Sequence, residues 1–164
     1  MAEKAMIVNY ILLTSQISLA LEDVIEGKDL TTQQHNLLKD GEKLLSKIIE
    51  GATLIEGKKF KNGVVPTMEG LSIYGYALST IQKLDFIKEI KAKQFTQFFE
   101  QLHNKMSELV DNKIKKDDKT IPQLKSFFVE LGSSFKQDIQ KESYYKEKTL
   151  PLTLKKQING YASV

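Results

Sequence analysis

The chain has 164 residues, of which 41 % are hydrophobic and 27 % are charged, as in a globular protein of one ordinary domain. It contains no cysteine, which excludes disulfides, thiolate nucleophiles and cysteine-ligated zinc or iron–sulfur sites. All 24 basic residues are lysine and the net charge is +3. The chain therefore has no guanidinium group for bidentate binding of phosphate or guanine, and no arginine finger.

Two stretches carry no charge, residues 5–21 and residues 70–82. In a chain this rich in charge, charge-free helices are expected to be buried on more than one side. Glu3 and the polar residues Asn9, Thr14 and Gln16 argue against a signal peptide in the first stretch. No run reaches the ~18 to 20 apolar residues expected of a transmembrane segment. We therefore expect a cytoplasmic protein.

The first predicted helix covers about residues 3–26 and has two apolar stripes when successive residues are placed roughly 100° apart. One stripe comprises Met6, Tyr10, Leu13, Ile17, Leu21 and Val24. The other includes a seam of four residues, Val8, Leu12, Ser15 and Leu19, which recur at intervals of four, three and four. This spacing is typical of residues packed against another helix. Gly27 follows where a left-handed C-cap is expected.

The seam can be hidden in three ways. In the first, the first helix lies at the centre of the fold. In the second, it pairs with its twin in a homodimer, and in the third it docks a different protein or a lipid-like ligand. We take the seam as the candidate protein-interaction surface.

The second predicted helix covers about residues 32–56. Thr31 and Gln34 have the spacing of a capping box, which indicates where the helix begins. Its leucines and isoleucines share one face about 140° wide, opposite a charged face, as in a half-buried helix. Gly41 lies on the apolar face, where we expect another helix to approach closely.

A third helix is predicted over about residues 68–83, with Thr67 as its N-cap. Its apolar residues point in all directions, which favours a central position. We place a break near Leu84, with Asp85 as the N-cap of a fourth helix. The fourth helix has a stripe about 120° wide, made of Phe95, Phe98, Phe99, Leu102, Met106, Leu109 and Val110.

The fifth predicted helix covers about residues 121–141, and Thr120 with Gln123 matches a second capping box. Its apolar stripe comprises Leu124, Phe127, Phe128, Leu131, Phe135 and Ile139. Residues 142–164 form an irregular tail. The fold prediction is thus a single all-α domain over residues 1–164, a helical bundle of about five principal helices with an ordered body at about 3–141.

The motifs that could carry chemistry are incomplete. Glu100 and His103 form a Glu-x-x-His pair, but a di-iron bundle needs two such pairs and two further glutamates. The only other histidine, His35, follows Thr32 at the matching offset. Neither histidine has a recognisable triad context. We therefore predict no catalytic residue, no metal site and no cofactor.

These observations favour a non-enzymatic module, an adaptor, assembly subunit or small regulator, which binds a protein partner through apolar helix faces. A second copy of the chain, in a homodimer, is one such partner. The alternative is a nucleic-acid-associated accessory protein using Lys58, Lys59, Phe60 and Lys61, because an aromatic ring among lysines can stack on bases near phosphates. A third hypothesis is an enzyme or carrier with a pocket lined by Tyr74, Tyr76 and Phe99.

Overall fold

The computed structural model describes residues 2–56, 67–87, 95–114 and 117–141. These residues form five helices and no strand, which confirms the all-α bundle. In chain order the helices are α1 (Ala2–Ile25), α2 (Thr32–Ile55), α3 (Met68–Ile81), α4 (Phe95–Val110) and α5 (Thr120–Lys141). The boundaries lie within two residues of the predicted ones, except at the start of the fourth helix.

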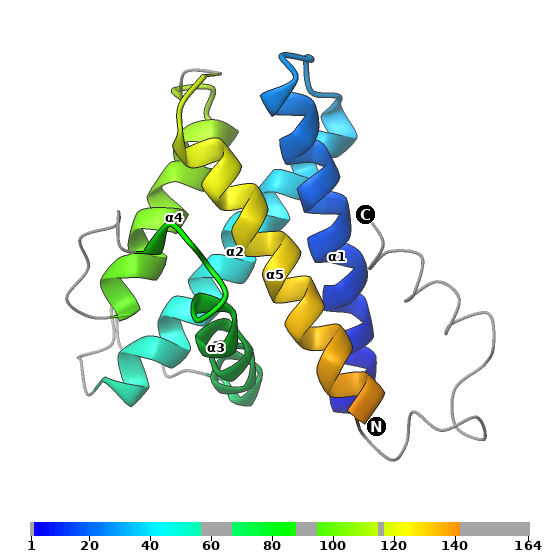
Figure 1. Ribbon diagram of the computed structural model, residues 1–164, viewed down its shortest axis with the longest axis vertical. Helices are drawn as coiled ribbons and strands as arrows, with labels where there is room; N and C mark the ends of the chain where they lie inside the picture. The colour runs from blue at the N-terminus through cyan, green and yellow to red at the C-terminus, as the bar shows by residue number, and fades with distance from the viewer. Residues whose placement is uncertain (1, 57–66, 88–94, 115–116, 142–164) are drawn as a thin grey trace.

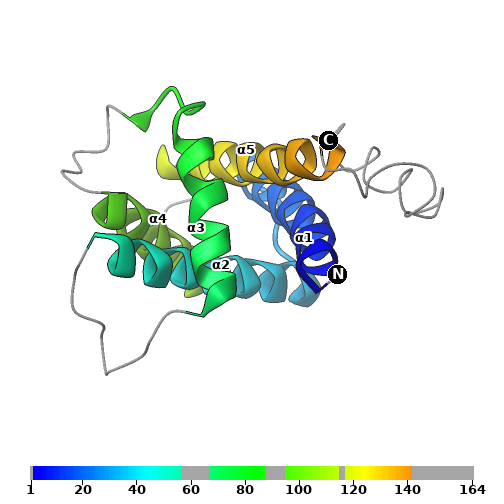
Figure 2. The same cartoon turned by 90° about the horizontal axis from the view of Figure 1, so that it is seen from below.

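The helices are arranged as two antiparallel pairs with a crossing helix at one end. α1 packs along α5, α2 packs along α4, and α3 lies across the end and joins α2 to α5 (Figures 1 and 2). α2 and α5 each have three substantial helix neighbours, whereas α1 and α3 have two each. The central positions therefore belong to α2 and α5. A central position, one of three alternatives for the first helix and the expectation for the third, is therefore not what the structure gives either helix, because each leaves one side outside the bundle.

α1 combines length with unusual apolarity. Its segment Ala5–Ile25 has a mean hydropathy of 1.4, which meets the length and composition of a membrane-spanning helix, contrary to the sequence prediction. The core helix of a folded bundle and a signal sequence meet the same criteria. Of the 18-residue apolar window within this segment, 56 % is buried inside the bundle, as expected for a helix packed on α5 and α2.

Three helix ends are set by the residues predicted for them. Gly27 has φ +80°, and the N–H groups of Gly27 and Lys28 bond back to Val24 and Asp23, which closes α1. Thr31 and Gln34 form the reciprocal capping box of α2. Thr67 Oγ1 accepts from the N–H of Gly70, 3.0 Å away, and starts α3.

The N-terminal ends of α4 and α5 differ from the prediction. α4 begins at Phe95, and the side chain that holds its first turn is Glu56 at the end of α2, whose carboxylate accepts from the backbone N–H of Thr96 at 3.1 Å and from the Thr96 hydroxyl. Asp85, the predicted cap, lies in a turn. At α5, Asp118 accepts from the N–H of Thr120 at 2.8 Å and from its hydroxyl. Asp118 therefore receives bonds from the residue that was predicted to be the cap.

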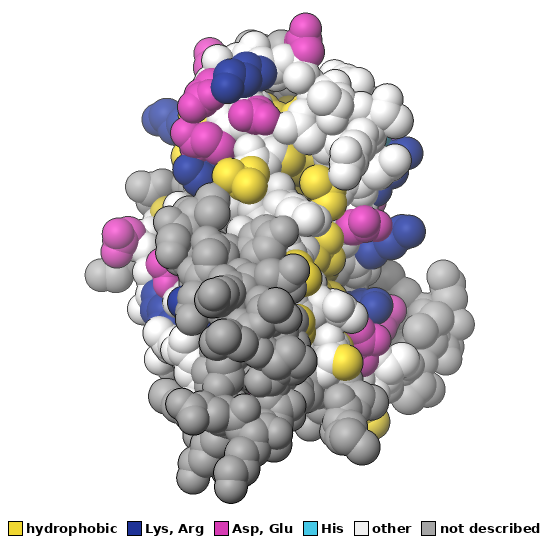
Figure 3. All heavy atoms as spheres, turned by 90° about the vertical axis from the view of Figure 1, so that its right-hand side faces the viewer, with side chains coloured by type: hydrophobic (Ala, Val, Ile, Leu, Met, Phe, Trp, Pro, Cys, Tyr) yellow, Lys and Arg dark blue, Asp and Glu magenta, His cyan; other side chains and the backbone are white. Residues whose placement is uncertain are grey.

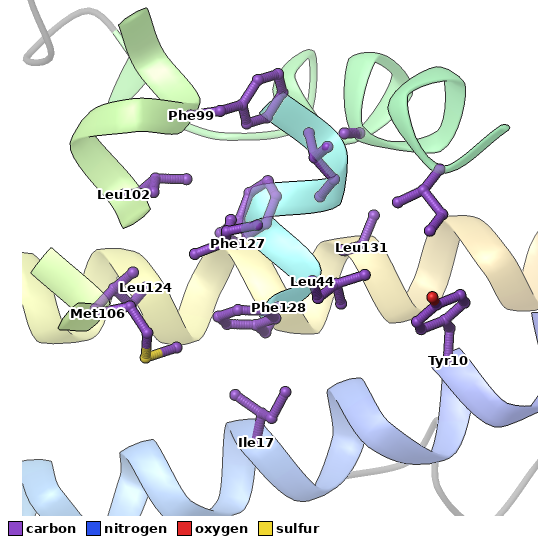
Figure 4. Close-up of a cluster of buried hydrophobic side chains, with 14 of the residues drawn as sticks. Tyr10, Ile17, Leu44, Phe99, Leu102, Met106, Leu124, Phe127, Phe128 and Leu131 are labelled. Carbon is purple, nitrogen blue, oxygen red and sulfur yellow. The ribbon is translucent and has the colours of Figure 1, made fainter. Parts of the chain in front are cut away.

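The core is built around aromatic rings of α4 and α5. Phe127 contacts Phe98, Phe99 and Phe128, with centroid separations of 5.4–6.4 Å and edge-on orientations. Such pairs favour the edge of one ring against the face of the next. Aliphatic residues of α1, α2 and α4 fill the space around them (Figure 4). Every residue of the predicted α5 stripe is fully buried, whereas Phe95 of the predicted α4 stripe is 46 % exposed.

Two glycines in α2 permit close packing. A Cβ on Gly41 would lie 3.1 Å from the side-chain tips of Ile17 and Met106, so the expected approach at this position is confirmed. At Gly51 the approach is closer and involves backbone: a Cβ would lie 2.5 Å from the carbonyl oxygen of Gly70 and 2.8 Å from the Cβ of Tyr74. Gly51 therefore sets the distance between α2 and α3.

Candidate interaction surface of the first helix

The four seam residues differ in exposure along α1. Val8, near the start, is 7 % exposed, Leu12 and Ser15 are half-buried, and Leu19 is 47 % exposed. The structure therefore closes the N-terminal end of the seam and leaves its C-terminal end open.

The open end of the seam borders a groove between α1 and α5. This groove has a volume of about 720 Å³. Its apolar lining consists of Leu19, Ile25, Pro122 and Val129. Ile25 is 38 % exposed and was not predicted as part of the surface. The sequence spacing could have indicated it, because Ile25 follows Ser18, another residue that lines the groove, by two helical turns.

Charged residues line the rim of the groove. Lys125 on α5 donates a hydrogen bond to the carboxylate of Glu22 on α1, which links the two helices across the opening. Glu130 lies further along the α5 side. The apolar strip is therefore flanked by charges of both signs, and both members of the ion pair remain about a third exposed.

A second hollow of about 330 Å³ continues the groove toward the other end of α5. The helices are closest there: a Cβ on Gly132 would lie 2.6 Å from Thr14 Oγ1. The hydroxyls of Thr14 and Ser18 bond to carbonyls of the preceding turn of α1, at 2.7 Å each. These buried polar residues are thus satisfied within their own helix, and the helices pack tightly against them.

On the face opposite the seam, Tyr10 joins three helices. Its hydroxyl donates to the Glu69 carboxylate on α3, and Lys47 Nζ on α2 lies 3.3 Å from both groups. Burial raises the pKa of Tyr10, and the hydrogen bond to Glu69 adds to the effect. The same hydrogen bond lowers the pKa of Glu69, against the opposing effect of burial.

Replacing Tyr10 by phenylalanine should destabilise the protein at neutral pH by about 1–3 kcal/mol, the usual cost of losing a hydrogen bond to a charged group. The contribution of a carboxylate with a lowered pKa is present above its unfolded-state value, about 4.3, and is lost as the pH falls through the folded-state value. The stability difference should therefore shrink between pH 7 and pH 3. Urea unfolding of both proteins at the two pH values measures it. A difference that grows at pH 3 would show that the hydroxyl does not act through Glu69.

His103 lies on α4, where it is partly buried beside α2. Its Nε2 is 3.0 Å from Ser46 Oγ and 3.8 Å from Glu42 Oε1, both on α2. A serine–histidine relay needs the acid on the other ring nitrogen, so that the histidine can take the serine proton while it is held by the acid. Here both partners face the same nitrogen. The cluster joins α2 to α4 and lacks the order of a catalytic triad.

The remaining candidates do not form a chemical site in the part of the chain that the structure describes. Within those ranges no group of three or more His, Asp or Glu side chains is placed to hold a metal ion. His35 lines a hollow of about 540 Å³ beside the start of α2. Tyr74 packs edge-on against Phe99, and the Tyr76 hydroxyl donates to Asp138 at 2.5 Å. Tyr74 and Phe99 thus contact each other, and Tyr76 is hydrogen-bonded to Asp138 of α5.

The lysine-rich cluster of the alternative hypothesis, Lys58, Lys59, Phe60 and Lys61, lies outside the described residues, and so does the predicted tail over residues 142–164. Comparison with known proteins also leaves the class of protein open: no family model matches the chain, and neither a curated protein nor a solved structure matches it.

Proposed function

We propose that this protein is a non-enzymatic interaction module whose partner protein binds at the open end of the seam, in the groove between α1 and α5. The observation that carries the proposal is the exposure of Leu19 and Ile25, two large apolar side chains of α1 that line the same groove. Apolar residues gathered in a polar-rimmed groove are typical of sites for another protein.

The shape and chemistry of the groove favour an amphipathic helix as the partner element. Such a helix would place an apolar stripe against Leu19, Ile25 and Val129 and its flanking polar residues against the rim. The rim presents Glu22, Glu130 and Lys125, so a partner helix with lysine on one flank and an acidic residue on the other would be complementary. These contacts would determine orientation and specificity more than affinity.

The experiment uses a photo-crosslinking amino acid at position 19 in cells that produce the protein, followed by purification of the crosslinked partner. The partner's affinity is then measured for wild type and for Leu19→Glu. We expect at least a tenfold loss of affinity. The fold should be retained, because an exposed side chain away from the core contributes little to stability.

Leu54→Glu is the matched control. Leu54 lies on α2 and is 40 % exposed, so the substitution makes the same chemical change at similar exposure on another helix. Equal loss of affinity in both variants, or no position-specific crosslink at position 19, would contradict the proposal. Binding that requires nucleic acid and falls steeply with salt would instead support the nucleic-acid alternative.

Light scattering on wild type and Leu19→Glu identifies whether the partner is a second copy. A dimer that becomes a folded monomer in the variant would assign the groove to self-association.

A further inference from the structure

The ion pair between Glu22 and Lys125 divides the groove between α1 and α5 into two apolar positions. Along α1, Ile25 lies on one side of this pair and Leu19 lies on the other, and both line the groove. The two residues are six positions apart in the sequence, which is about 9 Å along the helix axis at ~1.5 Å per residue. A partner that contacts both residues must therefore pass over an ion pair whose charges already neutralise each other.

Glu130 carries the one charge of this groove that has no partner in the described part of the chain. It is half-buried on α5 and lines both the groove and the adjoining hollow of about 330 Å³, so it lies where the two meet. Among the described residues, no hydrogen bond or ion pair involves its carboxylate. Lys136 lines the second hollow, but no ion pair between described residues joins it to Glu130. The groove therefore has an uncompensated negative charge at its inner end.

The partial charges of the two helix ends beside the groove oppose each other. α1 ends at Ile25 and α5 begins at Thr120, and the two helices are antiparallel, so a negative helix terminus lies next to a positive one (Figure 1). Figure 3 shows the side of the molecule where α1 faces outward, with hydrophobic side chains between charged groups. The side chains rather than the helix dipoles therefore determine the sign of the groove.

We propose that Glu130 determines the specificity of the groove and selects a partner helix with a basic side chain, lysine or arginine, beside its apolar stripe. This inference rests on the proposed function and narrows the partner from any amphipathic helix to a cationic one. A basic side chain at Glu130 forms a charge-assisted hydrogen bond with the half-buried carboxylate. An acidic side chain in the same place meets an uncompensated like charge, so Glu130 also excludes acidic helices. An acidic residue on the other flank of the helix matters less, because Lys125 is already bonded to Glu22.

A library of displayed helical peptides tests the proposal on the full-length protein. Every peptide has the same apolar stripe, and its flanking positions are randomised among lysine, glutamate and glutamine. Selection on the wild type is run beside selection on Leu19→Glu, which identifies peptides that bind outside the groove. We expect lysine to be enriched at a flanking position on the wild type. The enrichment should disappear on Glu130→Gln and change to glutamate on Glu130→Lys.

The affinity of the best selected peptide measures the size of the effect. Glu130→Gln should weaken binding by about three- to tenfold, the upper range for a partly exposed ion pair, and the loss should shrink at high salt. Glu100→Gln on α4 is the matched control, because Glu100 is also half-buried and makes no ion pair within the described ranges. It should leave the affinity unchanged. Circular dichroism and the melting temperature establish that each variant is folded.

The outcomes separate this inference from the proposed function. Selected helices that depend on Leu19 but show no preference for a flanking charge would overturn the role of Glu130 and leave the groove as a docking site. Equal losses of affinity for Glu130→Gln and Glu100→Gln would do the same. Enrichment of glutamate on the wild type would overturn the role of Glu130 in favour of Lys125 or Lys136. A library that yields no helix dependent on Leu19 would overturn both the inference and the proposed function.

Discussion

Phe127→Ala is expected to destabilise the protein by about 3–5 kcal/mol, the range found for truncating a buried phenylalanine. Phe127 is fully buried and its ring contacts Phe98, Phe99 and Phe128. Removing the ring loses its transfer free energy and leaves a cavity that rigid aromatic neighbours on α4 and α5 cannot readily fill. Since small domains are stable by only about 5–15 kcal/mol, the variant should be close to unfolding at room temperature.

Phe95→Ala is the control for this substitution. It makes the same chemical change on α4, but Phe95 is 46 % exposed, so we expect a cost below about 1 kcal/mol. Urea unfolding followed by circular dichroism measures both variants. Similar losses for the two would show that the aromatic cluster is not the centre of the core.

Gly51→Ala should be the second most damaging change, with a loss of about 2–3 kcal/mol despite alanine's better helix propensity. A Cβ at this position would lie 2.5 Å from the carbonyl oxygen of Gly70 and 2.8 Å from Tyr74 Cβ. Both atoms belong to or adjoin the backbone of α3 and cannot rotate away, so α2 and α3 must separate. The propensity gain, about 1 kcal/mol, does not offset this cost.

Gly75→Ala is expected to have the opposite effect on stability. A Cβ at Gly75, in the middle of α3, would meet nothing within 4 Å. The substitution should therefore stabilise the protein by up to about 1 kcal/mol through helix propensity alone. The melting temperature should fall for Gly51→Ala and rise for Gly75→Ala. A rise in both would mean that the α2–α3 crossing adapts without strain.

Leu12 is half-buried, so Leu12→Glu would disturb packing as well as any interaction, whereas Leu19→Glu changes an exposed position.

Much of the helical body could be predicted from sequence because its signals are local. The capping box of Thr31 and Gln34 joins residues three apart, and Gly27 ends α1 through bonds within one turn. The α5 stripe could be predicted because a fully buried face repeats at the helical period. The fold class follows from several such segments with no strand pattern between them.

Contacts between residues that are far apart in the chain leave no local pattern in the sequence from which they could be predicted. Glu56 holds the start of α4 across 40 positions, and Ser46 meets His103 across 57. The lack of a side chain at Gly51 matters because α3 crosses α2 at this position, and that crossing is visible only in the structure.

The sequence by itself determined the helices, most of their ends and the presence of a second apolar stripe on α1. Only the tertiary structure decided that Val8 is covered, that Leu19 is open, and that Ile25 joins it beside the groove. The physical reason is that helix formation depends on bonds and side chains within a few residues. Exposure depends on which faces meet, and that is settled by the packing of all five helices together.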